Sequence, residues 1–476
     1  MSGTRDLLTV LESSNGRSRA SSIARSDRSL DWLSLLPRDT RISVGAAVSA
    51  ALRRKLAAHS GAGAPTLVAL RSPSASQGLD AYSAVVVIDP ARDVPTLLDA
   101  HGFRHALRFV AIPSLDDPRI LVPLGNRLVA VGSLDLLAPY RLTARLKKQA
   151  LSGLTRLGFA HRAGDVILLA RRQPTELERY LQAVTGQDAS LLALSPGAEG
   201  EFRKLTIGVI GEDGRALAFA KVGWTAGARD AIDREAHMLM RLARHPELRG
   251  QVPALLGANT VDGGLVSVQL AGRGKSSSSE YGAEHDAFLK MLAAASSRRM
   301  RFSDSLMWRS IQTMYAQIVP RLPRERRELL RQVVEEVDLA LGARELDLSI
   351  AHRDFGPWNV RVQPGGRIFV FDWETAQPEM TPAYDYFDFQ TRSHVLYGKQ
   401  AAPAFLAGQW LSGCRRWHPG LPPAHLPALF LAYLLDRALS RSRYELWRGE
   451  AHHDPMLDLL ISLLESRAAW MAAEPR

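Results

Sequence analysis

The residues with the clearest chemical meaning lie in one short stretch of the second half of the chain. Asp354 and Asn359 are five positions apart, and Asp372 follows the strand-like run Ile368–Phe371. In phosphoryl transfer one Asp orients the attacking hydroxyl, while an Asn and a second Asp hold the Mg²⁺ that neutralises the transferring phosphate. The spacing therefore predicts a phosphoryl-transfer site in which Asp354 orients the hydroxyl and Asn359 and Asp372 bind the metal.

A tight hairpin is expected to bring these side chains together. Gly365 and Gly366 supply the turn, and Asp372 leaves the following strand where it can face a cleft. Taken singly, each polar residue also fits an ordinary loop position or a strand cap. Only the joint spacing favours the chemical interpretation, because a motif needs its structural context.

This motif resembles that of a family of small-molecule kinases. The stretch His352–Asn359, the hydrophobic strand after it and Asp372–Glu374 are similar to the pattern of the aminoglycoside phosphotransferase and choline kinase group. Asp354–Gly356 also spells the metal-binding triplet of protein kinases, but its place directly after His-Arg assigns Asp354 to the catalytic loop. The family usually has Gly where this chain has Arg353. The resemblance covers only residues 190–476, and it implies ATP and Mg²⁺ as cofactors.

A strand and a helix upstream supply the expected phosphate-binding pair. Ala216–Val222 alternates as a strand, and Lys221 falls on its apolar face. Ala231–Leu242 has helical periodicity, with Glu235 on the apolar stripe. The two residues resemble the strand lysine and helix glutamate that position the α- and β-phosphates of ATP in this family's fold. An incidental surface pair is the alternative.

Two further segments are candidates for nucleotide contacts. Gly197 and Gly200 precede the strand-like run 202–210 and could form a phosphate-covering turn in which the backbone approaches the ligand closely. A plain loop fits this stretch equally well. The run Gly264–Leu270, which includes Gln269, suits the strand and hinge that bind adenine.

The resemblance and the patterning together predict an α+β protein. We expect a bilobal protein-kinase-like fold, with a small β-rich nucleotide lobe over 188–272 and a larger helical lobe over 273–476 that carries the catalytic loop and acceptor site. A separate α/β accessory domain of unknown role is expected over 29–187. Residues 1–28 are rich in Ser and Arg and predict disorder.

The accessory region is expected to alternate strands and helices. The predicted strands are 83–89, 119–122, 127–131 and 166–170, and the predicted helices are 44–58, 94–101 and 139–157. In the helical lobe we expect helices over 301–319, 324–341, 403–413, 425–441 and 455–471. Asp385 is interpreted as a helix or loop anchor rather than a catalytic group.

Composition agrees with a globular enzyme. The chain has 476 residues, of which 46% are hydrophobic and 23% charged. The formal net charge of +11 does not favour a nucleic-acid partner, because Arg is dispersed along the chain and no nucleic-acid-binding motif is present. Cys414 is the single cysteine, so an intramolecular disulfide is excluded. The sequence has no apolar run long enough to span a membrane and predicts a cytoplasmic protein.

The predicted function is ATP- and Mg²⁺-dependent transfer of the γ-phosphoryl group to a hydroxyl of a small molecule. Two alternatives stay open: a protein kinase, and a nucleotide-sensing pseudokinase that acts as an interaction module. The acceptor itself cannot be inferred from a fold shared by kinases of aminoglycosides, choline and sugars.

Overall fold

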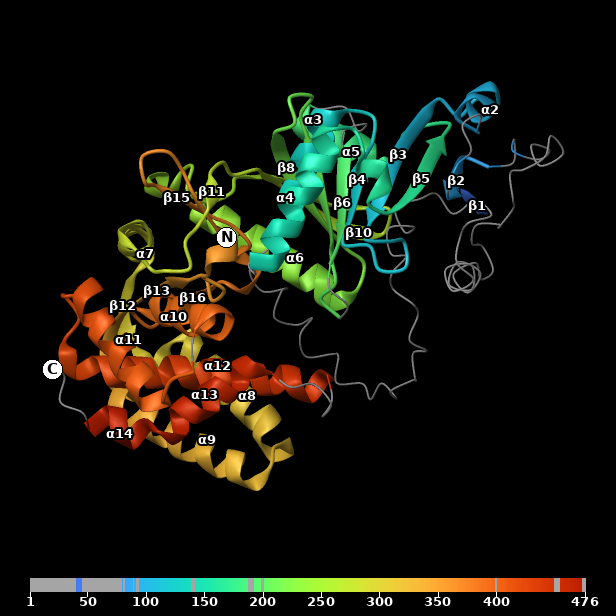
Figure 1. Cartoon of the computed structure of the whole chain (residues 1–476). Coiled ribbons are helices and arrows are strands. Elements are labelled where there is room, and N and C mark those ends of the chain that lie inside the picture. Colours follow the sequence, from blue (N-terminus) through green and yellow to red (C-terminus); the bar gives the residue numbers. More distant parts are fainter. Residues whose placement is uncertain are drawn as a thin grey trace, which may run out of the picture.

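The computed structural model describes residues 40–44, 79, 82–88, 90, 94–137, 142–186, 192–197, 201–398, 400–448 and 454–472. The predicted disordered segment 1–28, the helix predicted over 44–58 except its first residue, and Gly200 lie outside these residues. Figure 1 shows two parts, one built around a large sheet and one made mostly of helices. The chain is thus a mixed α+β protein.

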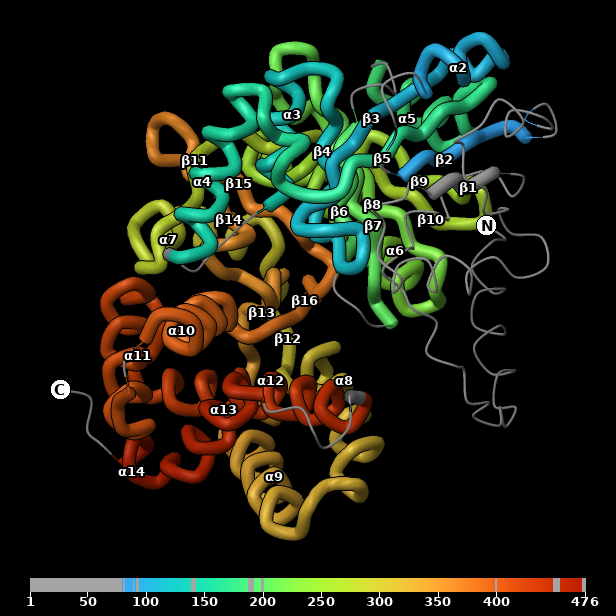
Figure 2. Tube along the Cα trace, turned by 45° about the vertical axis from the view of Figure 1, so that its right-hand side comes forward, coloured from blue at the N-terminus to red at the C-terminus, as the bar shows by residue number. Residues whose placement is uncertain are grey.

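One ten-stranded sheet crosses the whole upper part of the molecule. Its strands in spatial order are β1 (Thr40–Val44), β2 (Ala84–Ile88), β5 (Asp165–Arg171), β3 (His105–Ile112), β4 (Ile120–Pro123), β6 (Leu192–Pro196), β7 (Leu205–Ile210), β8 (Ala216–Gly223), β10 (Gly264–Leu270) and β9 (Leu255–Val261). β1 runs parallel to β2, and the other neighbouring pairs are antiparallel. Figure 2 shows the strands of this sheet gathered in the upper part of the molecule, above the helical part.

The sheet does not break at the expected boundary near residue 187. Leu121 on β4 pairs with Leu194 on β6, which joins the earlier strands to those of the nucleotide lobe. One buried apolar cluster spans the join and includes Phe109 and Leu121 from one side and Leu194 and Ile207 from the other. A separate accessory domain is therefore not confirmed, and the boundary itself stays a prediction.

Most elements expected in the first part of the chain are present, but one prediction is wrong. Residues 127–131, expected as a strand, belong to helix α3 (Arg127–Ser133). The side-chain oxygen of Asn126 accepts hydrogen bonds from the amides of Leu128 (2.8 Å) and Val129 (3.3 Å), which starts the helix. Val129 is buried whereas Leu128 is 58% exposed, so the apolar run does not lie wholly in the core. The hydrogen bonds of the capping residue Asn126 favour a helix here, and this outweighs the preference of the β-branched residues in the run for a strand.

Three other helices accompany the sheet before the catalytic part of the chain. They are α2 (Val94–Ala100), α4 (Leu142–Arg156) and α5 (Glu176–Thr185). The first two confirm predicted helices, whereas α5 and strand β3 were not expected. Helix α6 (Ala226–Leu242) packs on β8 and β10, and Thr225 caps it by accepting a hydrogen bond from the Ala228 amide (3.2 Å).

The other lobe is mostly helical, as expected. Its helices are α7 (Ala283–Ser296), α8 (Leu306–Ile318), α9 (Arg324–Val337), α10 (Tyr384–Tyr397), α11 (Pro403–Trp417), α12 (Leu426–Arg448), α13 (Pro455–Glu465) and α14 (Arg467–Ala472). Two small sheets connect it to the upper part: β11 (Lys275–Ser276) with β14 (Val360–Val362) and β15 (Ile368–Val370), and β12 (Arg298–Arg301) with β13 (Glu345–Ala351) and β16 (Gln377–Met380).

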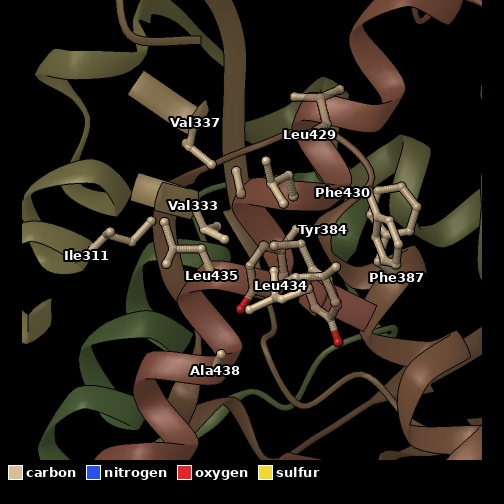
Figure 3. Packing of buried hydrophobic residues seen from close by; sticks show 14 of the residues in the cluster. Ile311, Val333, Val337, Tyr384, Phe387, Leu429, Phe430, Leu434, Leu435 and Ala438 are labelled. Atoms are coloured by element: carbon tan, nitrogen blue, oxygen red, sulfur yellow. The ribbon is translucent and has the colours of Figure 1, made fainter. Parts of the chain in front are cut away.

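Helix α12 forms the centre of the helical lobe. Figure 3 shows Phe430, Leu434 and Leu435 of α12 packed among side chains from neighbouring helices, including Val333 of α9 and Phe387 of α10. These α12 residues are fully buried, which is why this long apolar run is a core helix. Across the described parts of the chain, none of the helices combines the length and apolarity that crossing a bilayer requires.

Candidate active site

The catalytic loop begins where β13 ends and is held by a buried histidine. The Nδ1 atom of His352 accepts a hydrogen bond from the Asp354 amide (3.2 Å), so its Nε2 atom carries the proton and donates to the carbonyl of Phe371 (2.9 Å). His352 is fully buried. The ring therefore connects the loop that contains Asp354 to the strand end that precedes Asp372.

Asp385, on helix α10, binds the backbone of the same loop. Its carboxylate accepts hydrogen bonds from the amides of His352 (2.7 Å) and Arg353 (2.9 Å), and it lies in the first turn of α10. Burial raises the pKa of Asp385 to about 6, although the two amides oppose this change. The predicted role of Asp385 as an anchor agrees with this geometry.

Asp354 and Asn359 lie in direct contact. The amide nitrogen of Asn359 donates to the backbone oxygen of Asp354 (2.9 Å) and to its Oδ2 atom (2.8 Å). Because both N–H bonds point to Asp354, the amide oxygen of Asn359 is the atom that can face a cation. The Asp354 side chain keeps 24% of its surface exposed, so an acceptor could reach it.

The predicted hairpin places Asp372 beside this pair. Val360 on β14 pairs with Val370 on β15, and the Phe371 amide donates to the carbonyl of Asn359 (3.1 Å). Asp372 then adopts a left-handed backbone conformation with φ of 70°, which Asp tolerates better than most residues. This backbone turn takes Asp372 out of the strand and into the cleft.

Lys221 contacts two carboxylates at one end of the cleft. Its Nζ atom lies 2.9 Å from Oε1 of Glu235 and 2.6 Å from Oδ1 of Asp372. Glu235 is fully buried, and the same Oε1 accepts the Trp373 amide (3.1 Å). Burial alone would raise the pKa of Asp372, but the ammonium groups of Lys221 and Lys204 lower it to about 2. The structure thus brings together the residues that the sequence paired.

A carboxylate cluster next to Lys221 suits a divalent cation. One ligand atom from each of Glu235, Asp372 and Glu374 lies within 4.8 Å of the others. Carboxylate and amide oxygens are the ligands that Mg²⁺ prefers, and the Asp372 carboxylate is ionised at neutral pH. Asn359 directly precedes the β14–β15 hairpin that leads to Asp372, and the Phe371 amide donates to its carbonyl, so the residues present fit Mg²⁺.

Two members of this region were not predicted as site residues. Lys204 forms an ion pair with Glu374, and both are largely buried. Burial, followed by repulsion from Lys221, lowers the pKa of Lys204 to about 8. Glu374 stands in the recognised motif beside Asp372, which offered a clue, whereas Lys204 lies on a different hairpin and offered none.

A cavity of about 750 Å³ adjoins Lys221 and Asp372. This volume lies in the range of small-molecule sites. Phe219, Leu270 and Phe369 give it apolar walls. The Gln269 side chain also lines it and is only 5% exposed, and its Nε2 atom has no hydrogen-bond partner among the residues that the structure describes. Gln269 therefore offers a buried donor to a ligand.

Gly197 lies at the end of β6 and is not among the cavity-lining residues. Its amide donates to the carbonyl of Lys204 (2.8 Å), and a Cβ atom at this position would lie 2.6 Å from that oxygen. The glycine is thus required by the close approach of two chain segments in the β6–β7 hairpin. Its role in covering phosphates stays a prediction.

An arginine on α10 that the sequence did not single out reaches the catalytic loop. The Nη1 atom of Arg392 lies 2.5 Å from Oδ1 of Asp354, and its Nε atom lies 2.8 Å from Oδ2 of Asp388. The motif spacing gave no indication of this contact, because Arg392 and Asp354 are far apart in the sequence.

The family comparison identifies the class of protein. Residues 209–426 match the model of the phosphotransferase enzyme family, and they include Lys221, Asp354 and Asp372. This segment of the chain therefore belongs to that family, and the chain is a phosphotransferase. No curated protein shows significant sequence similarity to the chain.

Several solved structures resemble part of the chain. An aminoglycoside phosphotransferase from Alicyclobacillus acidocaldarius is 18% identical, covers 58% of this chain and 90% of its own, and gives a TM-score of 0.34. Aminoglycoside phosphotransferase APH(4)-Ia with AMP-PNP and hygromycin B is 18% identical and covers 62% and 99%, with a TM-score of 0.41. An ethanolamine kinase from Plasmodium vivax is 12% identical and covers 61% and 86%, with a TM-score of 0.39.

Proposed function

We propose that this protein transfers the γ-phosphoryl group of Mg·ATP to a hydroxyl group of a small molecule. The observation that carries the proposal is the contact of Lys221 with both Glu235 and Asp372 at the edge of a cavity of nucleotide size. A lysine held between two carboxylates in this way keeps its charge, because both carboxylates raise the pKa of its ammonium group and overcome the effect of burial.

Each side chain has a distinct task at the phosphate end. Lys221 binds the α- and β-phosphates, and Glu235 fixes its position. Asn359 and Asp372 would hold Mg²⁺, with Glu374 close enough to assist. When bound, Mg²⁺ neutralises negative charge on the transferring phosphoryl group. Gln269 contributes its free amide donor to the base.

Asp354 acts on the acceptor. Its carboxylate accepts a hydrogen bond from the attacking hydroxyl and takes up the proton as the new bond from oxygen to phosphorus forms. The bond between the γ-phosphorus and the bridging oxygen breaks at the same time and leaves ADP. Arg392 and Asn359 hold the two carboxylate oxygens in place, and each oxygen retains a second lone pair for the acceptor.

The decisive experiment separates nucleotide binding from transfer. Purified protein is incubated with Mg·ATP and a panel of hydroxyl-bearing metabolites, and ADP release is measured. For the acceptor that this screen identifies, Asp354→Asn should lower single-turnover transfer by roughly 10²–10⁴-fold while leaving Mg·ATP affinity nearly intact. Asp372→Asn should lose both, because the divalent ion loses an anionic ligand.

Asp233→Asn is a suitable control, since Asp233 is an exposed carboxylate of α6. It should leave binding and transfer unchanged. Full transfer activity in Asp354→Asn would contradict the assignment of the catalytic loop. A protein that binds Mg·ATP but releases no ADP with any acceptor, or on its own, would favour the pseudokinase alternative.

A further inference from the structure

One wall of the nucleotide cavity comes from a helix outside the family-matched segment 209–426. Arg145, Lys148, Gln149 and Ser152 of α4 line this cavity. Their spacing of three, four and seven residues from Arg145 places them on one face of the helix. A stripe of four polar side chains therefore faces the space assigned to the nucleotide.

The position of α4 is fixed by packing on its other side. Leu151 packs against a buried cluster that contains Val110, Ala130 and Leu134. Lys148, near the middle of the helix, ties α4 to the preceding segment, because its Nζ atom donates to the Leu137 carbonyl (2.8 Å) and contacts Oδ1 of Asp135 (3.3 Å). In Figure 1, α4 lies beside the strands of the upper sheet. The helix is thus an integral part of the cleft.

The strand register locates Leu136, which precedes α4 in the chain, relative to Gln269 and Lys221. Gly208 on β7 pairs with Phe219 on β8, and Phe219 pairs with Gln269 on β10. A Cβ atom at Gly208 would lie 3.3 Å from Cδ1 of Leu136, in the short segment that leads to α4. Lys221 lies two residues further along β8. Leu136 therefore lies at the level of Phe219 and Gln269, two residues along β8 from Lys221.

The charges around the cavity also suit a polyphosphate-bearing ligand. Five cationic side chains and two anionic ones line it: Arg145, Lys148, Lys221, Lys275 and Arg361 against Asp135 and Asp372. A positive excess in a cleft attracts anions such as ATP and disfavours a polycationic occupant. The α4 stripe supplies two of these five cations.

We infer that α4 is part of the nucleotide site and that its polar stripe binds the ribose and base of the nucleotide. This inference rests on the proposed use of ATP. Arg145 and Gln149 provide hydrogen-bond donors that suit ribose hydroxyl oxygens and the acceptor atoms of a base. The region before residue 188 then contributes directly to nucleotide affinity, although every recognised motif lies after it.

Point substitutions in the full chain test the inference. Arg145→Ala and Gln149→Ala should each weaken Mg·ADP binding, measured by calorimetry, and Arg145→Ala should raise the dissociation constant by roughly tenfold, as expected for the loss of one charge-assisted hydrogen bond. Lys147→Ala is the matched control, because Lys147 is an exposed lysine of the same helix that does not line the cavity. It should change the constant by less than about twofold.

A second probe locates the contact along the nucleotide. Inorganic tripolyphosphate carries the phosphate chain without ribose or base, so its affinity should fall sharply in Lys221→Ala and much less in Arg145→Ala, which removes only a longer-range attraction. In the unaltered chain, saturating Mg·ADP should also slow amide hydrogen exchange over 142–156. This hydrogen-exchange measurement uses only the unaltered chain, so it does not depend on whether any variant folds.

The possible outcomes distinguish a failure of the α4 inference from a failure of the proposed function. The role of α4 alone would be overturned if Arg145→Ala and Gln149→Ala bound Mg·ADP as tightly as the unaltered chain. It would also be overturned if ADP binding left amide hydrogen exchange in α4 unchanged. If Arg145→Ala weakened the binding of tripolyphosphate and of ADP equally, the assignment of Arg145 to the ribose and base would be overturned. Failure of the unaltered chain to bind any adenine nucleotide would instead contradict the proposed function.

Discussion

At the scale of single residues, Arg353 is the clearest departure from the family's usual glycine. Its backbone is left-handed, with φ of 62°, a conformation that glycine adopts without strain and other residues adopt at a cost. Its guanidinium compensates by binding Oε1 of Gln377 (2.7 Å) and Oδ2 of Asp436 (2.7 Å), and Asp436 is fully buried. The side chain therefore ties the catalytic loop to α12.

Restoring the family residue should destabilise this protein. Arg353→Gly relieves backbone strain of about 1 kcal/mol but leaves the Asp436 carboxylate buried without its cation, which costs about 3–5 kcal/mol. We expect a net loss of roughly 2–4 kcal/mol in the free energy of unfolding, measured by urea titration. The double variant Arg353→Gly/Asp436→Asn should recover part of this loss, because no buried charge is left unpaired. A single variant as stable as the unaltered chain would show that the hydrogen bond from the Tyr384 hydroxyl suffices to hold the buried Asp436 carboxylate.

At the scale of elements, α10 is what positions the catalytic loop. Asp385, Asp388 and Arg392 follow one another at helical spacing. The first accepts the loop amides, the second pairs with the third, and the third contacts Asp354. Burial lowers the pKa of the Arg392 guanidinium, but Asp354 and Asp388 overcome this and raise it. The helix thus fixes both the backbone and the carboxylate of the loop.

The raised pKa of Asp385 gives this helix a measurable pH dependence. Its folded pKa of about 6 lies above its ordinary value of 3.8, so between these values the folded protein binds a proton that the unfolded chain does not. The contribution of Asp385 to stability should therefore fall as pH rises from 4 to 6 and stay level above 6. We expect the difference in unfolding free energy between the unaltered chain and Asp385→Asn to fall across this interval, by at most about 3 kcal/mol.

Urea unfolding of both proteins at pH 4, 5, 6 and 7 measures this difference. Comparing the two cancels the titration of the remaining carboxylates. Parallel pH profiles would show that Asp385 titrates alike in both states, and that its two backbone hydrogen bonds fully offset the effect of burial.

At the scale of the whole molecule, the parts before and after residue 187 share one core. The apolar cluster of the ten-stranded sheet includes Phe109 and Leu121 together with Leu194, Ile207 and Val209. Removing the first part would expose the edge of β6 and the faces of these side chains to water. Each fully buried aliphatic or aromatic side chain of this kind contributes about 1.5–3 kcal/mol.

We therefore expect a fragment of residues 188–476 to be much less stable than the full chain. It should aggregate or unfold at a clearly lower temperature, because its sheet has lost a neighbouring strand and half of its apolar cluster. Light scattering and thermal unfolding, with the full chain as the control, measure this. A soluble monomeric fragment with the melting temperature of the full chain would show that the expected domain boundary is a true one.

The sequence by itself predicted which residues come together at the candidate active site. Asp354 and Asn359 come just before the β14–β15 hairpin and Asp372 just after it, so the turn and the short strands suffice to bring them together. Lys221 and Glu235 are joined by a strand and the helix that follows it, and their periodicities place both side chains on the buried faces. Contacts of this kind follow from local spacing, which a single sequence displays.

The tertiary structure alone decided what surrounds that centre. Arg392 reaches Asp354, and α4 lines the cavity beside Lys221. Leu121 pairs with Leu194 and makes one sheet of two expected domains. Each contact joins segments whose separation along the chain has no periodic pattern. Which distant surfaces meet depends on how all the apolar faces are buried at once, and this is a property of the complete fold rather than of any one segment.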